Sequence, residues 1–239
     1  MSTTPGEFAR ALQAKRRRQR RARLLILSAV ASVLVLVGVA TWLFGFSSVF
    51  AAKQVRVTGV SLLSEDQVSQ VAAVDLGRPL ATLDLGNVRE RVATLAPVDE
   101  VKVERRFPDT VEITITERTL SYLWSDGTTL RWVDSEGVVF HEGGEPPAGM
   151  VTAQVDAPDQ RLLQDVSTVV QAVVPVLGER ITLVRATAVD QIEIRLDDGD
   201  TVVWGSADES ELKAQVLAVL LKQEASVYDV SAPEAPTTR

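Results

Sequence analysis

Few side chains in this 239-residue sequence have the types and spacing that catalysis or metal binding would need. The chain contains no cysteine, which excludes disulfides, thiolate metal sites and a cysteine nucleophile. Its single histidine, His141, excludes a histidine-rich metal site. Phosphate-binding glycine loops and the G-x-S-x-G nucleophile motif are also missing. We therefore predict no catalytic, cofactor-binding or metal-binding residues, and the residues alone leave an enzyme unsupported.

Three weaker patterns have simpler interpretations than chemistry. His141 adjoins Glu142 in a loop rich in glycine and proline, where a surface histidine is commoner than a general base. The acidic run 197–200 lacks the spaced ligands of a calcium loop and is typical of a hairpin turn. Carboxylates are frequent enough for glycosidase-like pairs to arise by chance. A membrane-anchored cell-wall hydrolase remains an alternative, and it would require perturbed carboxylates in a cleft.

The charges are distributed unevenly along the chain. The first 23 residues carry eight basic side chains and one acid, which gives +7. The rest carries 17 basic and 31 acidic residues, which gives −14. This asymmetry indicates that the two ends of the chain face different surroundings.

An uncharged apolar segment, residues 24–46, follows the basic residues. As a helix it would be about 34 Å long, enough for a bilayer core of about 30 Å. Aromatic residues, which prefer the membrane interface, gather near its far end. The positive-inside rule then places the N-terminus in the cytoplasm and the C-terminal bulk outside, as a single-pass type II protein of the cell membrane.

Two features of this region have alternative interpretations. A cleaved signal peptide with a site at Val49-Phe50-Ala51 is disfavoured, because the apolar run is longer than a signal core. The basic residues are interpreted as determinants of topology that also contact anionic lipid. Nucleic-acid binding and a twin-arginine export signal are the alternatives, and we predict no nucleic-acid partner. The residues assigned to topology and lipid contact are Lys15, Arg16, Arg17, Arg18, Arg20, Arg21 and Arg23.

Residues 53–118 predict the element order β-α-α-β-β. A short alternating strand ends at Gly59, and Ser64 with Gln67 forms a capping box that starts a helix. Asp84 or Asn87 can cap a second helix, which Pro97 should terminate. Two alternating strands then flank a hairpin at 108–109. Two helices covering a three-stranded sheet make a small α+β domain.

Residues beyond 118 predict a mostly β region with two helices. Strands are expected at 120–124, 128–133, 138–140, 181–187, 191–196, 201–204 and 227–231. Helices are expected at 160–174, ended by Pro175, and at about 208–225. Residues 141–150 are expected to form a loop, and a proline-containing tail follows the last strand.

Residues 97–118 carry a resemblance to a known family. They contain a P-x-V motif, an R-x-(F/W)-P-D-T hairpin and a strand closing on Glu-Arg, as in the FtsQ/DivIB family of bacterial division proteins. The matching residues are Pro97, Val101, Val103, Arg105, Arg106, Phe107, Pro108, Asp109, Thr110, Ile113, Ile115, Glu117 and Arg118. Trp124 and residues 133–140 resemble the family's V-D-x-x-G-x-x-F segment, and 213–221 with 228–231 resemble its closing helix and strand.

The resemblance implies an α+β chain with a single N-terminal transmembrane helix. The implied parts are a basic cytoplasmic tail (1–23), the span (24–46), a POTRA domain (53–120), a mixed, mostly antiparallel β domain with flanking helices (121–231) and a flexible tail (232–239). From the residues alone, Arg105 and Arg106 are interpreted as a solvated strand end rather than a binding hairpin. Many relatives have a long final strand, which is absent here or reduced to the tail.

The resemblance also implies a scaffold rather than a catalyst. Family members join FtsB and FtsL and thereby help control the septal peptidoglycan synthase pair FtsW and FtsI. The predicted location is the cell membrane at the division septum, without a cofactor. A weak homodimer is a further possibility. A POTRA-type transport module is the other alternative, although it would carry a barrel or several POTRA copies.

In the family, the C-terminal β edge takes up a strand from FtsB, a contact called β-augmentation. We therefore expect an unpaired strand edge near 227–231 to offer main-chain donors and acceptors. The expected partner-binding residues are Lys213, Lys222, Val227, Tyr228, Asp229, Val230 and Ser231. A proline at Tyr228 is expected to abolish FtsB binding and to leave the fold intact.

Overall fold

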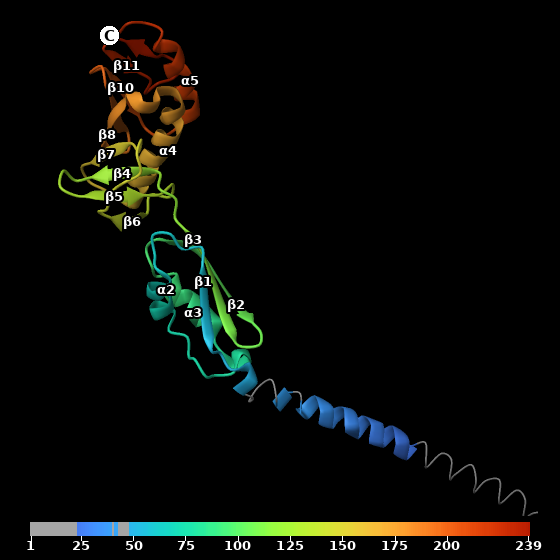
Figure 1. Ribbon diagram of the computed structural model, residues 1–239. Helices are drawn as coiled ribbons and strands as arrows, with labels where there is room; N and C mark the ends of the chain where they lie inside the picture. Colours follow the sequence, from blue (N-terminus) through green and yellow to red (C-terminus); the bar gives the residue numbers. More distant parts are fainter. Residues whose placement is uncertain (1–22, 40, 43–47) are drawn as a thin grey trace, which may run out of the picture. The chain divides into compact units, whose positions relative to one another are not determined.

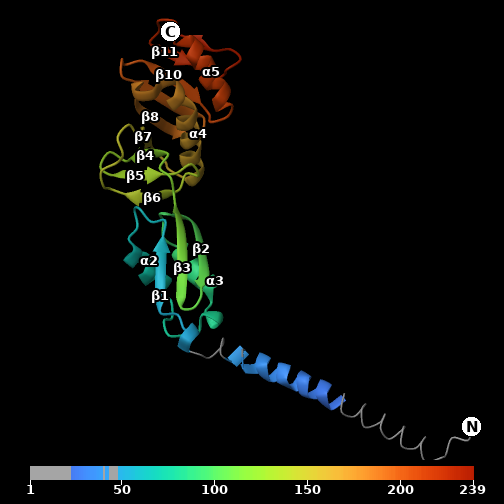
Figure 2. The same ribbon diagram turned by 45° about the vertical axis from the view of Figure 1, so that its right-hand side comes forward.

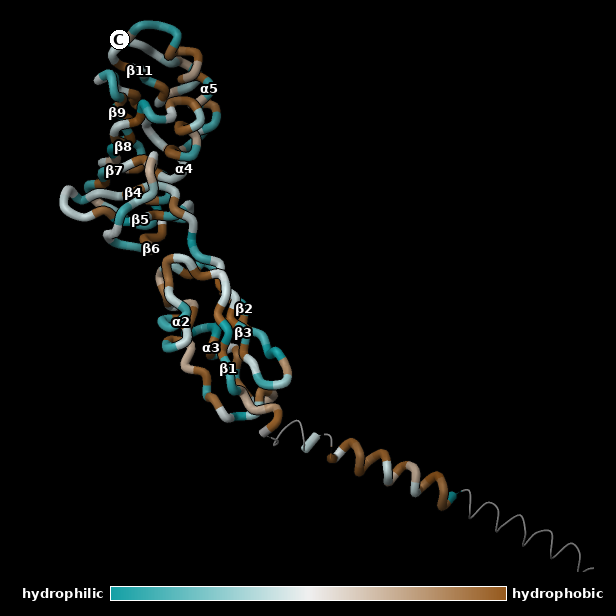
Figure 3. Tube along the Cα trace, viewed as in Figure 1, coloured by the Kyte–Doolittle hydropathy of each residue, from teal (hydrophilic) through white to brown (hydrophobic). Residues whose placement is uncertain are grey.

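The computed structural model describes residues 23–39, 41–42 and 48–239 (Figure 1). Residues 23–39 are helical, and Figure 3 shows this helix to be strongly apolar. Within the described ranges, no helix reaches the combined length and hydropathy that a membrane crossing requires. Residues 40 and 43–46 of the predicted span lie outside the described residues, as do residues 1–22, which hold all the basic cluster except Arg23.

A three-stranded sheet with two helices forms the first part of the fold (Figure 1). Its strand order is β1-β3-β2, and its chain order is β-α-α-β-β, as predicted. The elements are η1 (Ser48–Phe50), β1 (Gln54–Thr58), α2 (Glu65–Ala72), η2 (Leu80–Thr82), α3 (Leu85–Val92), β2 (Val98–Arg106) and β3 (Thr110–Glu117).

Local sequence signals explain where these helices begin. The Ser64 amide donates to Gln67 Oε1 at 2.9 Å and the Gln67 amide donates to Ser64 Oγ at 3.2 Å, which is the predicted capping box. Asp84, rather than Asn87, caps α3, because Asp84 Oδ1 accepts from the Asn87 amide at 3.1 Å. Helix α3 ends at Val92, so Pro97 does not terminate it.

A nine-stranded sheet forms the second part, in the order β12-β11-β10-β9-β8-β7-β4-β5-β6. Five of its neighbouring pairs are antiparallel and three are parallel, so the sheet is mixed and mostly antiparallel, as predicted. The strands are β4 (Tyr122–Ser125), β5 (Leu130–Val133), β6 (Val139–Glu142), β7 (Thr152–Val155), β8 (Ile181–Ala188), β9 (Gln191–Leu196), β10 (Thr201–Gly205), β11 (Val227–Asp229) and β12 (Thr237–Thr238).

Two helices, α4 (Gln160–Leu177) and α5 (Ser210–Leu220), lie on the same face of this sheet (Figure 2). The strands alternate accordingly: Ile192, Ile194 and Leu196 of β9 are buried, and the residues between them are exposed. Buried side chains of both helices and of the sheet form one hydrophobic core. That core holds β10 and β11 against α5, which positions the C-terminal edge of the sheet.

Several sequence predictions for this part are wrong in detail. His141 and Glu142, predicted in a loop, belong to β6, and α5 ends at Leu220 rather than near residue 225. Helix α4 continues through Pro175 to Leu177, because a proline in the last turn removes only one hydrogen bond before Gly178 ends the helix. Strand β7 has no counterpart among the predicted elements. The predicted tail contains β12, so residues 237–238 pair with the sheet.

The chain has two compact units, and their boundaries do not coincide with those of the two sheets. One unit holds the described residues up to Arg56 together with 73–88 and 103–113. The other holds 57–72, 89–102 and 114–239. The predicted domain boundaries therefore stay predictions.

Candidate partner-binding edge

Strand β11 is paired on both of its sides. It runs parallel to β10, where Tyr228 lies opposite Val202, and antiparallel to β12, where Tyr228 lies opposite Thr238. The main chains of Val227 and Arg239 exchange two hydrogen bonds, each of 2.9 Å. The expectation of an unpaired edge at 227–231 is therefore wrong, because the chain's own residues 237–239 cover β11.

The outer edge of the sheet belongs to β12, and its geometry follows from the alternation of antiparallel pairs. Val227 and Arg239 form a hydrogen-bonded pair, so the next pair, Tyr228 and Thr238, is not hydrogen-bonded. The amide and carbonyl of Thr238 consequently point away from β11. They are the main-chain donor and acceptor that β12 presents to an added strand.

Strand β11 is anchored in the protein by its own side chains and by those of the two residues that follow it. Tyr228 is buried, and its hydroxyl donates to the Gln223 carbonyl at 2.9 Å. Val230 is fully buried. Asp229 Oδ1 accepts from the amide and the hydroxyl of Ser231, at 3.0 and 2.7 Å, which turns the chain away after the strand. Of the predicted set on this strand, only Ser231 is exposed, while Val227 and Asp229 are half-buried.

The two predicted lysines differ in accessibility. Lys213 is only 2% exposed, and its Nζ donates to the Ser206 carbonyl at 2.8 Å. Burial lowers the pKa of Lys213, although Asp208 and Glu209 act in the opposite direction. Lys213 is thus a buried side chain and not a surface contact, which corrects its prediction, whereas Lys222 is exposed.

The hairpin motif at 105–109 has two roles within the first sheet. Arg105 donates to the carbonyls of Leu80 and Leu83, both at 2.6 Å, so it holds η2 while the residue stays exposed. Arg106 pairs with Glu112 at 2.5 Å and stays exposed, as a solvated strand end would.

The tip of this hairpin contacts residues that precede β1. Phe107, next to Pro108, contacts the ring of Phe50, and Asp109 forms an ion pair with Lys53 at 3.8 Å. The motif therefore connects the tip of the β2–β3 hairpin to the segment that leads into β1. Of the basic residues assigned to lipid contact, Arg23 is described and exposed.

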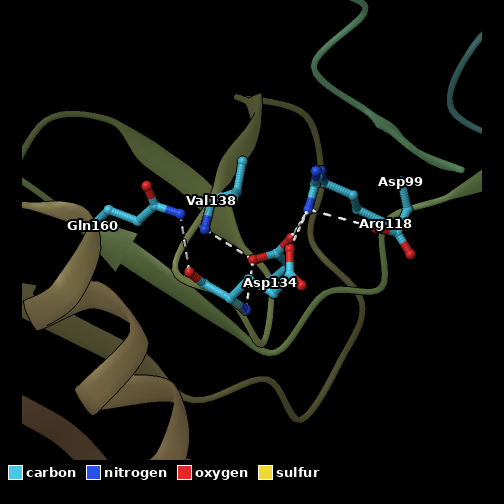
Figure 4. Close-up of polar contacts among 6 residues, drawn as sticks. Asp99, Arg118, Asp134, Val138 and Gln160 are labelled. Atoms are coloured by element: carbon cyan, nitrogen blue, oxygen red, sulfur yellow. Dashed lines mark hydrogen bonds and ion pairs between the residues drawn. The ribbon is translucent and has the colours of Figure 1, made fainter. Parts of the chain in front are cut away.

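A polar cluster follows β3 and has no counterpart among the predicted site residues (Figure 4). Arg118 donates to Asp134 and to Glu136, the latter at 3.3 Å, and pairs with Asp99 at 3.7 Å. Burial alone would lower the pKa of Arg118, but the hydrogen bonds to Asp134 and Glu136 outweigh it and raise the pKa. The only signal in the sequence was the presence of Arg118 and Asp134 in two family motifs.

Comparison with known proteins supplies the class of each part. Residues 50–118 match the model of the FtsQ-type POTRA domain, and residues 122–232 match that of the FtsQ/DivIB C-terminal domain. A POTRA domain followed by this C-terminal β region is the combination that the two sheets form.

Whole-chain relatives agree with the domain matches. Cell division protein FtsQ of Streptomyces bingchenggensis is 38% identical over 234 residues, covering 93% of this chain and 88% of the relative. The FtsQ proteins of Mycobacteroides abscessus and of Mycobacterium tuberculosis H37Rv are 32% and 33% identical. Each alignment covers 90% of this chain, and 69% and 68% of the respective relatives. The chain belongs to the FtsQ/DivIB family of cell division proteins.

Proposed function

We propose that this chain is a non-catalytic scaffold of the division machinery, anchored in the cell membrane by one span. In this proposal it binds FtsB and FtsL and, through them, influences the peptidoglycan synthases FtsW and FtsI at the septum. The family supports the division role. The POTRA domain would serve a second partner.

The anchor is proposed from the sequence of residues 1–46. The apolar run 24–46 is long enough to span a bilayer, and all eight early basic residues precede it. Leu24, Leu25 and Leu36 of the described helix are each about two-thirds exposed, at 65%, 71% and 68%. Such side chains lower their free energy when they leave water for lipid.

The outer edge of β12 carries the proposal for FtsB. Thr238 directs its amide and carbonyl away from β11, so a strand of FtsB could pair there and extend the nine-stranded sheet. Lys222, in the turn after α5, and Ser231, two residues after β11, are exposed and are the predicted side chains still available to a partner. The edge is supported by the neighbouring buried or half-buried residues Val227, Tyr228, Asp229 and Val230.

A proline at Thr238 tests this contact. It removes the outward amide and leaves the Val227–Arg239 hydrogen bonds in place, because those bonds use neighbouring residues. An acceptor in the FtsB strand would lose its donor, and we expect the Kd for the FtsB–FtsL complex to rise about tenfold or more. The measurement is titration of the full chain in detergent with the purified complex from the same host.

Thr238→Val is the matched control, since it keeps the amide and removes only the hydroxyl. We expect its Kd to equal that of the parent chain. Equal affinity of Thr238→Pro and Thr238→Val would overturn the proposed strand contact.

A further inference from the structure

The tip of the β2–β3 hairpin, residues 106–109, exposes a large apolar ring. Phe107 is the aromatic residue of this tip, and it is 55% exposed. Val49, in the segment that contacts this tip, is 59% exposed. Aromatic rings have a large apolar area, and the free energy falls when that area leaves water.

The hairpin tip is tied to the residues that directly follow the predicted span. The rings of Phe107 and Phe50 meet edge to face, with centroids 6.1 Å apart and planes at 74°. The amides of Lys53 and Gln54 both donate to the Asp109 carbonyl, at 2.8 and 3.3 Å. The tip therefore has a fixed position relative to residues 50–54.

Chain length limits how far this tip can lie from the bilayer. Phe50 follows Phe46, the last residue of the predicted span, by four residues, which can extend over at most about 14 Å. With about 4 Å from the Phe50 Cα to its ring and 6.1 Å between the ring centroids, the Phe107 ring lies within roughly 25 Å of the end of the span. Aromatic rings are enriched in the interfacial layer that borders the hydrocarbon core.

We propose that the hairpin tip inserts Phe107, beside Phe50, into the interface of the bilayer that the chain's own span crosses. The proposal rests on the proposed membrane anchor. Charged groups around the tip carry both signs: Arg106 pairs with Glu104 and Glu112, and Lys53 pairs with Asp109. The contact is therefore apolar rather than electrostatic, and it should persist at high salt.

A unique thiol tests the contact, because the chain contains no cysteine. Full-length Phe107→Cys, labelled with an environment-sensitive dye, is reconstituted into vesicles of phosphatidylethanolamine and phosphatidylglycerol that contain doxyl lipids. Val189→Cys is the matched control, since Val189 is 41% exposed in the turn between β8 and β9. We expect a blue shift and loss of fluorescence at position 107, strongest with shallow doxyl groups, and neither at 189.

A second measurement needs no dye on the protein. Lipids with a photoactivatable diazirine below the headgroup are mixed with the unmodified chain, and trypsin releases peptides 107–118 and 186–195. Cross-links to 107–118 alone support the contact. Equal responses at the two sites, in chains that float with the vesicles, overturn the contact and leave the anchor intact. Chains that fail to float contradict the anchor and the contact together.

Discussion

Asp134 and Arg118 form an ion pair at the point where the chain leaves β3. The Asp134 side chain is 6% exposed, and its second oxygen accepts from the amides of Glu136 and Val138 at 2.9 and 2.8 Å (Figure 4). One carboxylate thus fixes both the Arg118 guanidinium and the turn between β5 and β6.

Removing this carboxylate should be costly. Asp134→Ala removes the buried partner of Arg118, which keeps only the more exposed Glu136 and Asp99, and leaves two amides without their acceptor. We therefore expect a loss of about 2–4 kcal/mol in the free energy of unfolding. Glu136→Ala is the control, because the Glu136 side chain is 65% exposed and its pair should be worth less than about 1 kcal/mol. Denaturant unfolding of the two variants measures both values, and equal losses would contradict the assignment.

Gly137, in the same turn, has no room for a side chain. Its φ is +76°, and a Cβ would lie 2.4 Å from the Gln160 carbonyl oxygen and 2.6 Å from the Gln164 nitrogen. We expect Gly137→Ala to destabilise the chain by more than about 2 kcal/mol, because α4 would have to shift. Gly127→Ala, at φ +93° with open space around it, should cost only about 1 kcal/mol. Unfolding midpoints that match would refute the steric explanation.

Glu117 should contribute a pH-dependent part of the stability. Burial alone would raise its pKa, but hydrogen bonds from the Leu62 and Leu63 amides outweigh this effect and hold the pKa below the ordinary value for a glutamate. Because the folded pKa is lower than the unfolded one, this stabilisation is present above the unfolded pKa and is lost as the pH falls through the folded pKa.

The substitution Glu117→Gln isolates that contribution. We expect the variant to be less stable than the parent near neutral pH, and the difference to shrink as the pH falls through and below the ordinary pKa of a glutamate. Unfolding free energies of both chains across this range measure it. A difference that stays constant would show that the charge of Glu117 plays no part.

Tyr228 and Thr238 should respond oppositely to proline. The Tyr228 amide faces β10, by the same alternation that turns Thr238 outward, and its ring is buried. Tyr228→Pro should therefore destabilise the chain by about 3 kcal/mol or more, which replaces the expectation from sequence that this substitution leaves the fold intact. Thr238→Pro should change stability by less than about 1 kcal/mol. Thermal unfolding in detergent compares them, and a similar loss in both would mean that the register is wrong.

Local patterns predicted the elements well where the signal lay in neighbouring residues. The capping box of Ser64 and Gln67 and the alternation of Ile192 with Ile194 depend on residues a few positions apart. Strand β12 could not be found this way, because two threonines have no hydrophobic pattern and pair only through main-chain contacts with β11.

The sequence predicted the strand at Val227–Asp229, but not its pairing with a further strand on its outer side. Strand β11 lies near the edge, yet β12 covers it, so the outward groups belong to Thr238. Lys213 looked like a surface residue because charged side chains are usually exposed. Its burial depends on the Ser206 carbonyl, seven residues away, which accepts a hydrogen bond from Lys213 Nζ.

The most direct test of the scaffold proposal is division in the native host. Cells depleted of the chain are rescued with N-terminal fluorescent fusions of the parent, Thr238→Val or Thr238→Pro, and cell length and septal fluorescence are imaged. The account predicts normal division with the parent and with Thr238→Val, and long undivided cells with a stably produced Thr238→Pro. Normal division with Thr238→Pro would contradict the claim that the outer edge of β12 carries the function.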